Sequence, residues 1–383
     1  MKHLILSIFA ILLLQVSLAT AFGAEPTTED TPETASPENW TIEKIECVGN
    51  EITSCSIIEN EIYLRAGDKV NEEQIENAQL RLKTLGLFYD VQLYLQKGTS
   101  RGQVILMAQV VERSRHYINF TGYSYLTGHS LETSSATIAV GDRNLFGLGK
   151  RLEVSAQKYL DQSTQSFNAV YEDPNIFGSP RYFASVNVSY YKSAYRETAV
   201  ESTGLSLSIG RRIFDFSYIK LLAREANFNS RYSDQTEIHS HNLMGGIEYG
   251  WNTQDDVYFP TSGSTFALGA EVAKDNSYYY LNSSYAQGLN QDYNLLVDAF
   301  ASYIQSDIAE FSYGNIGVTP AIAKYFSFHR QGERVADRMK IFAAVSASKS
   351  LDLNTIHLDP KAGVSYLIDS FGKIDFTLSF AGL

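Results

Sequence analysis

The chain of 383 residues carries 43 acidic and 31 basic side chains, which gives a formal net charge of −12. That charge argues against a nucleic-acid partner, which would need a basic face. The mean hydropathy of −0.17 excludes a membrane protein built from many apolar helices. A barrel of alternating strands remains compatible with it, because half of the side chains of such strands face water.

The first 24 residues match a secretory signal peptide. Met1-Lys2-His3 is a basic start, Leu4 to Leu14 is wholly apolar, and small residues follow between Ala19 and Ala24. The apolar run is too short to span a bilayer, which takes about 20 residues. Residues 25–40 hold three prolines and five acids. They have little to bury, so we expect a disordered linker.

Two cysteines occur, Cys47 and Cys55. An exported chain enters an oxidising compartment, so we expect a disulfide between them. We expect no metal, because His239 and His241 share one strand face without a third ligand. The sequence contains neither a Gly-x-Ser-x-Gly motif nor a phosphate-binding loop. We therefore expect no cofactor, no catalytic residue and no enzymatic activity.

Residues 41–113 indicate a compact α+β unit in the order β-α-α-β-β. Ser54 can cap a first helix, and Asn71 with Gln74 forms a capping-box pattern for a second one. Gly86 ends the second helix, and two strands follow at 88–96 and 103–111. The apolar positions at helical spacing are Ile57, Ile58 and Ile62 in the first helix, and Ile75, Ala78, Leu82 and Leu85 in the second.

This unit resembles a POTRA (polypeptide-transport-associated) domain. The resemblance rests on these positions: Gly49-Asn50, Leu64, Gly67, Leu85-Gly86, Phe88, Val91 and Glu112. By this resemblance, the strand around Tyr89 to Leu95 would be the edge that binds a client strand. Its alternate members would be Tyr89, Val91, Leu93 and Leu95. One such module fits before the remainder of the chain.

Residues 115–383 lose the helical spacing and alternate instead. Leu205, Leu207 and Ile209, for example, are separated by Ser206 and Ser208. A water-soluble β-sandwich also alternates, but the series is long and its separators switch between tight turns and longer polar stretches. We therefore predict an all-β antiparallel transmembrane barrel, because an unpaired strand edge is costly in lipid.

We find fifteen candidate strands, near 115–125, 133–141, 150–160, 164–173, 181–192, 199–209, 213–226, 239–251, 264–273, 277–288, 293–304, 314–325, 338–348, 359–368 and 373–381. Bacterial single-chain barrels normally have an even number of strands. The expected count is therefore about 14 or 16, with one strand split or missed between 305 and 337.

A module of this kind before a barrel resembles the BamA/TamA-type superfamily of outer-membrane assembly and translocation proteins. Three stretches at 141–149, 172–178 and 255–263 resemble its periplasmic turns, with Phe146, Phe177, Tyr258 and Phe259 suited to an interfacial aromatic girdle. The turn residues are Asn144, Gly147, Gly149, Asp173, Pro174, Pro260 and Gly263. The superfamily's Arg-Gly-aromatic signature of a long inward-folded loop is absent, and Arg330-Gln331-Gly332-Glu333 is a poor match.

The resemblance implies an outer-membrane protein that captures unfolded clients on its periplasmic module and assists their insertion or translocation. The clients would be outer-membrane or secreted polypeptides, and the barrel would part its first strand, Tyr117 to Tyr125, from its last, Lys373 to Phe380. Outer-membrane lipids would surround it, and the resemblance also admits periplasmic or lipoprotein accessory partners. The alternatives are a passive porin or structural barrel, and an outer-membrane lipase.

Overall fold

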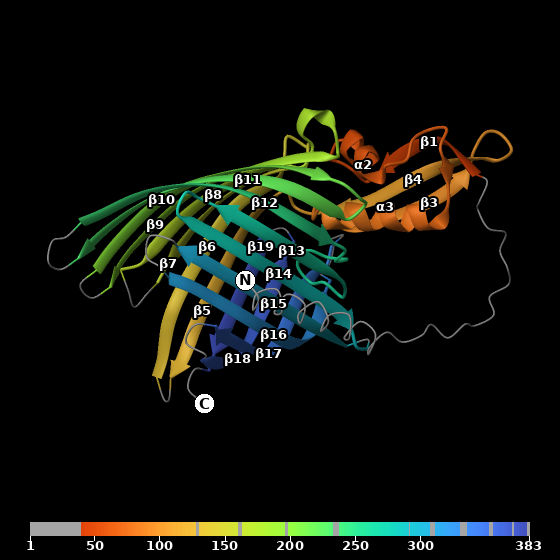
Figure 1. Ribbon diagram of the computed structural model, residues 1–383. Helices are drawn as coiled ribbons and strands as arrows, with labels where there is room; N and C mark the ends of the chain where they lie inside the picture. Colours follow the sequence, from red (N-terminus) through yellow and green to blue (C-terminus); the bar gives the residue numbers. More distant parts are fainter. Residues whose placement is uncertain are drawn as a thin grey trace.

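The molecule consists of a small α+β module at one end of a β-barrel (Figure 1). The computed structural model describes residues 40–380 except 128–129, 160–162, 196–197, 233–236, 291, 307–310, 330–334, 352–354 and 370. The predicted signal peptide and residues 25–39 of the predicted linker lie outside the described residues. None of the described helices is long and apolar enough to cross a bilayer.

The module is a four-stranded sheet covered by two helices. Its elements are β1 (Trp40–Val48), α2 (Cys55–Ile62), β2 (Lys69–Val70), α3 (Glu72–Thr84), β3 (Phe88–Lys97) and β4 (Gln103–Glu112). The strand order is β2-β1-β4-β3, with β1 parallel to β4 and the other pairs antiparallel. The predicted order is confirmed, with the two-residue strand β2 added between the helices.

The helix ends follow the sequence signals in part. Asn71 and Gln74 form the predicted reciprocal capping box at the start of α3. The side chain of Ser54 makes no capping bond to α2, which corrects that prediction, and its hydroxyl contacts Ser56 instead. The helices press Ile58, Ile62, Ala78 and Leu82 against the sheet, where all four are fully buried.

Fifteen strands close the barrel among the described residues. They are β5 (His116–Thr127), β6 (Ser130–Leu145), β7 (Lys150–Lys158), β8 (Gln165–Asp173), β9 (Tyr182–Tyr195), β10 (Thr198–Arg212), β11 (Ser217–Tyr232), β12 (Glu237–Asn252), β13 (Ser262–Val272), β14 (Asn276–Gly288), β15 (Tyr293–Ser306), β16 (Phe311–Phe328), β17 (Asp337–Ser350), β18 (Ile356–Ile368) and β19 (Gly372–Ser379). A 3-10 turn, η1 (Ile176–Gly178), lies between β8 and β9.

The count of fifteen confirms a barrel of about 14 to 16 strands, but its odd parity corrects the expectation of an even number. Each candidate strand has its counterpart, and residues 311–328 form one long strand, so no split or missed strand is found there among the described residues. An odd number of up-and-down strands makes the first and last run the same way. The barrel therefore closes by a parallel pairing of β19 with β5, whereas its other neighbouring strands pair antiparallel.

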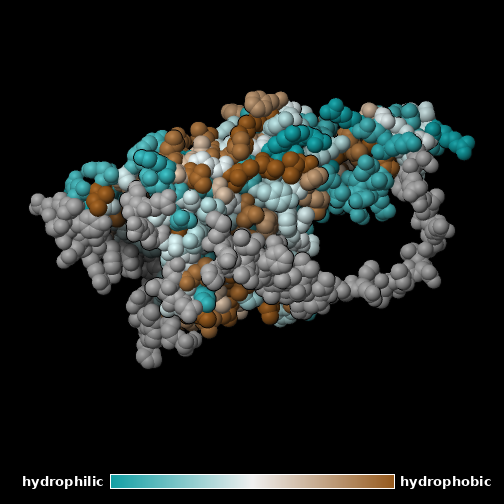
Figure 2. Space-filling view, viewed as in Figure 1, coloured by the Kyte–Doolittle hydropathy of each residue, from teal (hydrophilic) through white to brown (hydrophobic). Residues whose placement is uncertain are grey.

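The barrel wall alternates as a membrane-spanning sheet requires. Leu205, Leu207 and Ile209 are exposed on the outer face of β10, while Ser206 and Ser208 are partly covered on the lumen side. Figure 2 shows hydrophobic side chains gathered over the wall of the barrel and mostly hydrophilic ones over the module.

Candidate functional site at the periplasmic face and the strand seam

The predicted client edge is an edge of the module sheet. β3 pairs with β4 on one side only. Val91 and Leu93 are buried in the module core and Leu95 packs against it. Gln92 and Tyr94 are exposed on the opposite face. The alternate residues named from the sequence therefore supply core side chains, and a bound strand would meet their backbone groups.

Two backbone groups of this edge are already capped by side chains. The N–H of Leu93 donates to Oε1 of Gln79 on α3 at 3.3 Å, and the N–H of Val91 donates to Oδ1 of Asp90 at 2.9 Å. Both N–H groups therefore face away from β4. The alternation of an antiparallel ladder makes Leu95 the next residue whose backbone faces outward.

The turn motif at 144–149 docks the module rather than merely reversing the chain. Nδ2 of Asn144 donates to Oγ1 of Thr53 at 2.8 Å, and the N–H of Ser54 donates to the carbonyl of Gly147 at 2.9 Å. Oδ1 of Asn144 accepts from the N–H of Gly149 at 2.7 Å. A Cβ on Gly147 would lie 2.3 Å from the carbonyl oxygen of Ile52, so close approach requires glycine.

Glu112 holds the docking loop in place from the module side. Its carboxylate accepts the N–H groups of Glu51, Ile52 and Thr53 at 3.1, 2.9 and 2.6 Å. The disulfide between Cys47 and Cys55 closes the same loop, with the two Cα atoms 5.8 Å apart. The loop that receives the barrel turn is thereby fixed at both ends.

The second predicted turn supports the first. Asp173 pairs with Nζ of Lys150 at 3.0 Å and accepts the N–H of Asn175 at 3.0 Å. The ring of Pro174 would lie 3.7 Å from a Cβ on Gly149. The two turns are therefore adjacent at the barrel rim.

Asp256, in the third turn motif, is the centre of a buried charge cluster. Oδ2 accepts from Arg113 and from Arg338, each at 2.9 Å, and Oδ1 accepts the N–H groups of Tyr258 and Phe259. Burial acts to raise the pKa of Asp256. The two guanidiniums and the two N–H bonds outweigh it and hold the pKa below its ordinary value.

Aromatic rings enclose this cluster and join it to the client edge. The guanidinium carbon of Arg113 lies 5.6 Å from the ring centre of Tyr89, and that of Arg338 lies 5.4 Å from it. Tyr258 lies under Arg113 and Arg143. Phe259 is 1% exposed, which corrects its assignment to the interfacial girdle.

The remaining residues of this turn hold its shape. The carbonyl of Pro260 accepts the hydroxyl of Tyr325 at 2.9 Å. Gly263 has a φ of +96°, and a Cβ there would overlap the carbonyl of Thr253.

A third contact between module and barrel was not predicted. Oε1 of Glu61 on α2 pairs with Arg212 at 2.8 Å, and Arg81 on α3 pairs with Asp215 at 3.1 Å. Burial raises the pKa of Glu61 although Arg212 and Arg81 oppose it. The sequence held one signal, because Arg81 interrupts the apolar face shared by Ala78, Leu82 and Leu85.

The predicted seam residues lie where β5 and β19 meet, but they do not all pair. The register runs from Ile374 opposite Phe120 to Ser379 opposite Tyr125. The N–H of Lys373 donates to Oδ1 of Asn119 at 2.9 Å. Two other predicted residues bond elsewhere: the hydroxyl of Tyr117 donates to Glu153, and the N–H of Phe380 donates to the carbonyl of Pro360 on β18.

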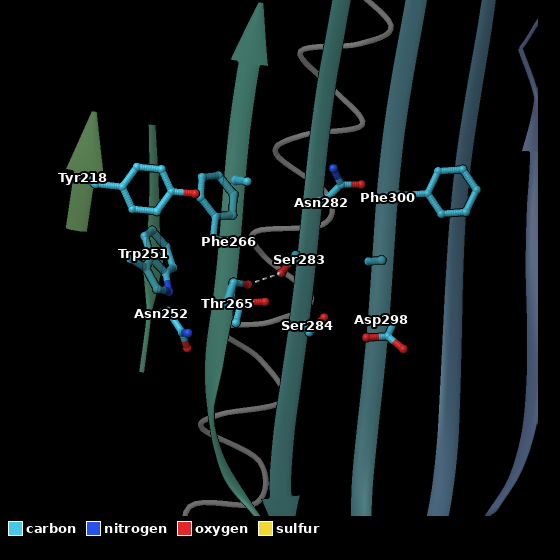
Figure 3. A pocket seen from close by; sticks show the side chains of 12 residues that line it. Tyr218, Trp251, Asn252, Thr265, Phe266, Asn282, Ser283, Ser284, Asp298 and Phe300 are labelled. Atoms are coloured by element: carbon cyan, nitrogen blue, oxygen red, sulfur yellow. Dashed lines mark hydrogen bonds between the residues drawn. The ribbon is translucent and has the colours of Figure 1, made fainter. Parts of the chain in front are cut away.

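The lumen wall is polar and hollowed. Asn282, Ser284 and Asp298 line an open cavity of 590 Å³ bounded by Tyr218 and Phe300 (Figure 3). The connections at the end of the barrel away from the module have two to six residues. Among the described residues, no group of three or more His, Cys, Asp or Glu side chains is arranged to hold a metal ion.

A closed transmembrane barrel with one module clamped to its rim defines the class of an outer-membrane β-barrel protein with a periplasmic domain. Residues 144–327 match the family model of the Omp85 superfamily domain, and residues 40–113 match the POTRA model, described as surface antigen variable number repeat. The chain therefore carries one POTRA domain followed by an Omp85 domain. It is an outer-membrane protein whose POTRA domain lies in the periplasm.

Solved structures of CdiB share this fold at low sequence identity. CdiB from Acinetobacter baumannii is 14% identical over 87% of this chain and 69% of that chain, with a TM-score of 0.56. CdiB from Escherichia coli is 11% identical over 86% and 72%, with a TM-score of 0.50. BamA from Haemophilus ducreyi lacking POTRA domains 1–3 is 14% identical over 89% and 81%, with a TM-score of 0.49.

Proposed function

We propose that the POTRA domain captures unfolded outer-membrane or secreted polypeptides by adding their strands to the edge of β3. The barrel then assists insertion or translocation of the client at the seam between β5 and β19. Backbone hydrogen bonds give such an edge affinity with little sequence demand. The observation that carries the proposal is the position of this edge. Among the described residues β3 has no strand partner on its outer side, although side chains cap the N–H groups of Val91 and Leu93. Tyr89 at its start packs on the arginines of the Asp256 cluster, so a captured strand would begin at the barrel rim.

The experiment uses two glutamines that differ in strand position. Gln92 on the edge strand and Gln109 on the adjacent strand β4 are register partners, and both are exposed. Each is replaced by cysteine in a variant that retains the native disulfide, and disulfide trapping is measured against unfolded outer-membrane proteins that carry one cysteine. A disulfide needs Cα atoms within about 7 Å, so trapping at Gln92 well above that at Gln109 supports strand addition. Equal trapping at both positions contradicts it.

A passive pore is the second candidate, because the lumen wall is polar and hollowed and the outer connections are short. Planar-bilayer recordings of the full chain test it. Steady conductance that persists when the seam is locked by an engineered disulfide would favour the pore. A closed barrel under the same conditions would favour client handling.

A further inference from the structure

Three successive periplasmic turns expose phenylalanine rings. Phe146, Phe177 and Phe214 are 77%, 84% and 72% exposed, and they lie in the turns that follow β6, β8 and β10. Large apolar rings this exposed are unfavourable in water. At the rim of a transmembrane barrel, exposed aromatic rings are favoured at the interface of the lipid. The exposure therefore indicates contact with the membrane.

The backbone holds two of these rings, Phe146 and Phe177, in the left-handed region at a cost. Phe177 has a φ of +61°, a strained conformation for a bulky residue. Local hydrogen bonds keep it there, since Asp173 accepts the N–H of Asn175 and the carbonyl of Ile176 accepts the N–H of Ser179. In Figure 1 this turn stands beside α2 at the rim of the barrel. Strain at an exposed apolar residue points to a binding role.

A cation with no acidic partner among the described residues packs on a tyrosine that the Phe177 ring also contacts. Arg211 is the register partner of Tyr182, and its guanidinium carbon lies 5.8 Å from the Tyr182 ring centre. The Phe177 ring meets the same tyrosine edge-on, with centroids 6.5 Å apart. Arg211 makes no ion pair with any residue that the structure describes. On β10 it continues the outward row of Ile209 and Leu207, so it ends the lipid-facing surface at its periplasmic edge.

We propose that Phe177, Tyr182, Arg211 and Phe214 form a binding site for the phosphate of an anionic phospholipid in the periplasmic leaflet. A guanidinium suits phosphate because it offers paired N–H donors, and the exposed rings contact the acyl chains. Because Arg211 continues the lipid-facing surface of β10, the ligand is a lipid rather than a free anion.

The test counts lipid retained by the purified full chain. The protein in an uncharged detergent is mixed with phosphatidylglycerol or phosphatidylcholine, and native mass spectrometry measures bound lipid. We expect preferential retention of phosphatidylglycerol. Arg211→Gln should weaken it about fivefold, the effect of one basic side chain at an anionic surface. Arg211→Lys should largely restore it. Arg101→Gln, which removes an exposed charge from the distant β3–β4 hairpin, should change nothing.

A second variant separates lipid from free anion. Phe177→Ser with Phe214→Ser should reduce retention of both lipids while leaving the β-sheet circular dichroism of the barrel unchanged. Equal retention of the two lipids by the unaltered protein, or unchanged phosphatidylglycerol retention in Arg211→Gln, would overturn the proposal. Release of phosphatidylglycerol by excess inorganic phosphate, with no effect of the serine variant, would assign the site to a free anion and equally overturn it.

Discussion

At the scale of single residues, Asp256 connects three parts of the molecule. It bridges Arg113, which follows the POTRA sheet, and Arg338 at the start of β17. Replacing Asp256 with Asn would leave two buried guanidiniums without a counter-charge. Loss of one partner from a buried ion pair costs about 3 kcal/mol. We therefore expect faster hydrogen exchange in β3 and β4 for Asp256→Asn, measured in detergent micelles.

Asp255, the neighbouring residue, provides the control for this prediction. The pH dependence of the effect tests the direction of the Asp256 pKa shift. Asp255 bonds to its own turn at Thr261 and Ser262, so Asp255→Asn should leave exchange in the POTRA domain nearly unchanged. The pKa of Asp256 is lowered, so its stabilisation is complete above the ordinary carboxyl pKa of about 3.9 and is lost only as pH falls below it. The Asp256→Asn penalty should therefore be equal at pH 8 and pH 6. A penalty that vanishes at pH 6 would contradict the assignment.

Alanine substitutions at two glycines distinguish the effect of backbone strain from the effect of a close contact between two chain segments. Gly147 and Gly178 have φ values of +74° and +66°, so alanine strains both by about 1 kcal/mol. Gly147→Ala also drives a Cβ to 2.3 Å from the Ile52 carbonyl, whereas nothing lies within 4 Å at Gly178. We expect Gly147→Ala to loosen the docking loop and raise protease sensitivity at 51–54. Similar sensitivity in Gly178→Ala would show that strain alone is responsible.

At the scale of elements, the side chain of Gln79 reduces the number of backbone donors that the β3 edge offers to an added strand. It occupies the N–H of Leu93, a donor that an added strand would need. Gln79→Ala should therefore strengthen binding of an unfolded client peptide about fivefold, the value of one net hydrogen bond of about 1 kcal/mol. Fluorescence anisotropy with a labelled peptide measures it, and Glu76→Ala, an exposed truncation on the same helix, is the control. Unchanged affinity in Gln79→Ala would exclude strand addition at Leu93.

The sequence was most informative where local rules decide the outcome. The capping box of Asn71 and the apolar stripe of α3 are local patterns, and period-two alternation located every barrel strand. It was less informative about contacts between distant segments. Asn144 and Gly147 were predicted only as turn formers. The loop at 51–54 with which they form hydrogen bonds lies about ninety residues earlier in the chain, so no local pattern indicates the contact. Arg212 and Arg338 gave no local signal, since their partners are set by how the POTRA domain sits on the rim.

At the scale of the whole molecule, three contacts fix the POTRA domain to the barrel. They involve the loop at 51–54, the Asp256 cluster and the ion pairs of Glu61 and Arg81. Each joins a different part of the module to a different periplasmic turn, so a hinge at one contact would break the others. A client strand on β3 would thus be presented to the rim in one fixed orientation.

The parallel seam is the weakest joint of the barrel wall. Its register covers only Ile374 to Ser379, whereas β10 and β11 pair from Thr198 to Arg212, and parallel pairs are slightly less stable per residue.

Cysteines at Thr121 and Asp375, which are register partners across the seam, would lock it. We expect locking to block client insertion into proteoliposomes and its reduction to restore insertion. A matched lock at Thr137 and Gln157, partners across β6 and β7, should have no effect. Insertion that persists with the seam locked would mean that clients enter the membrane without opening this joint.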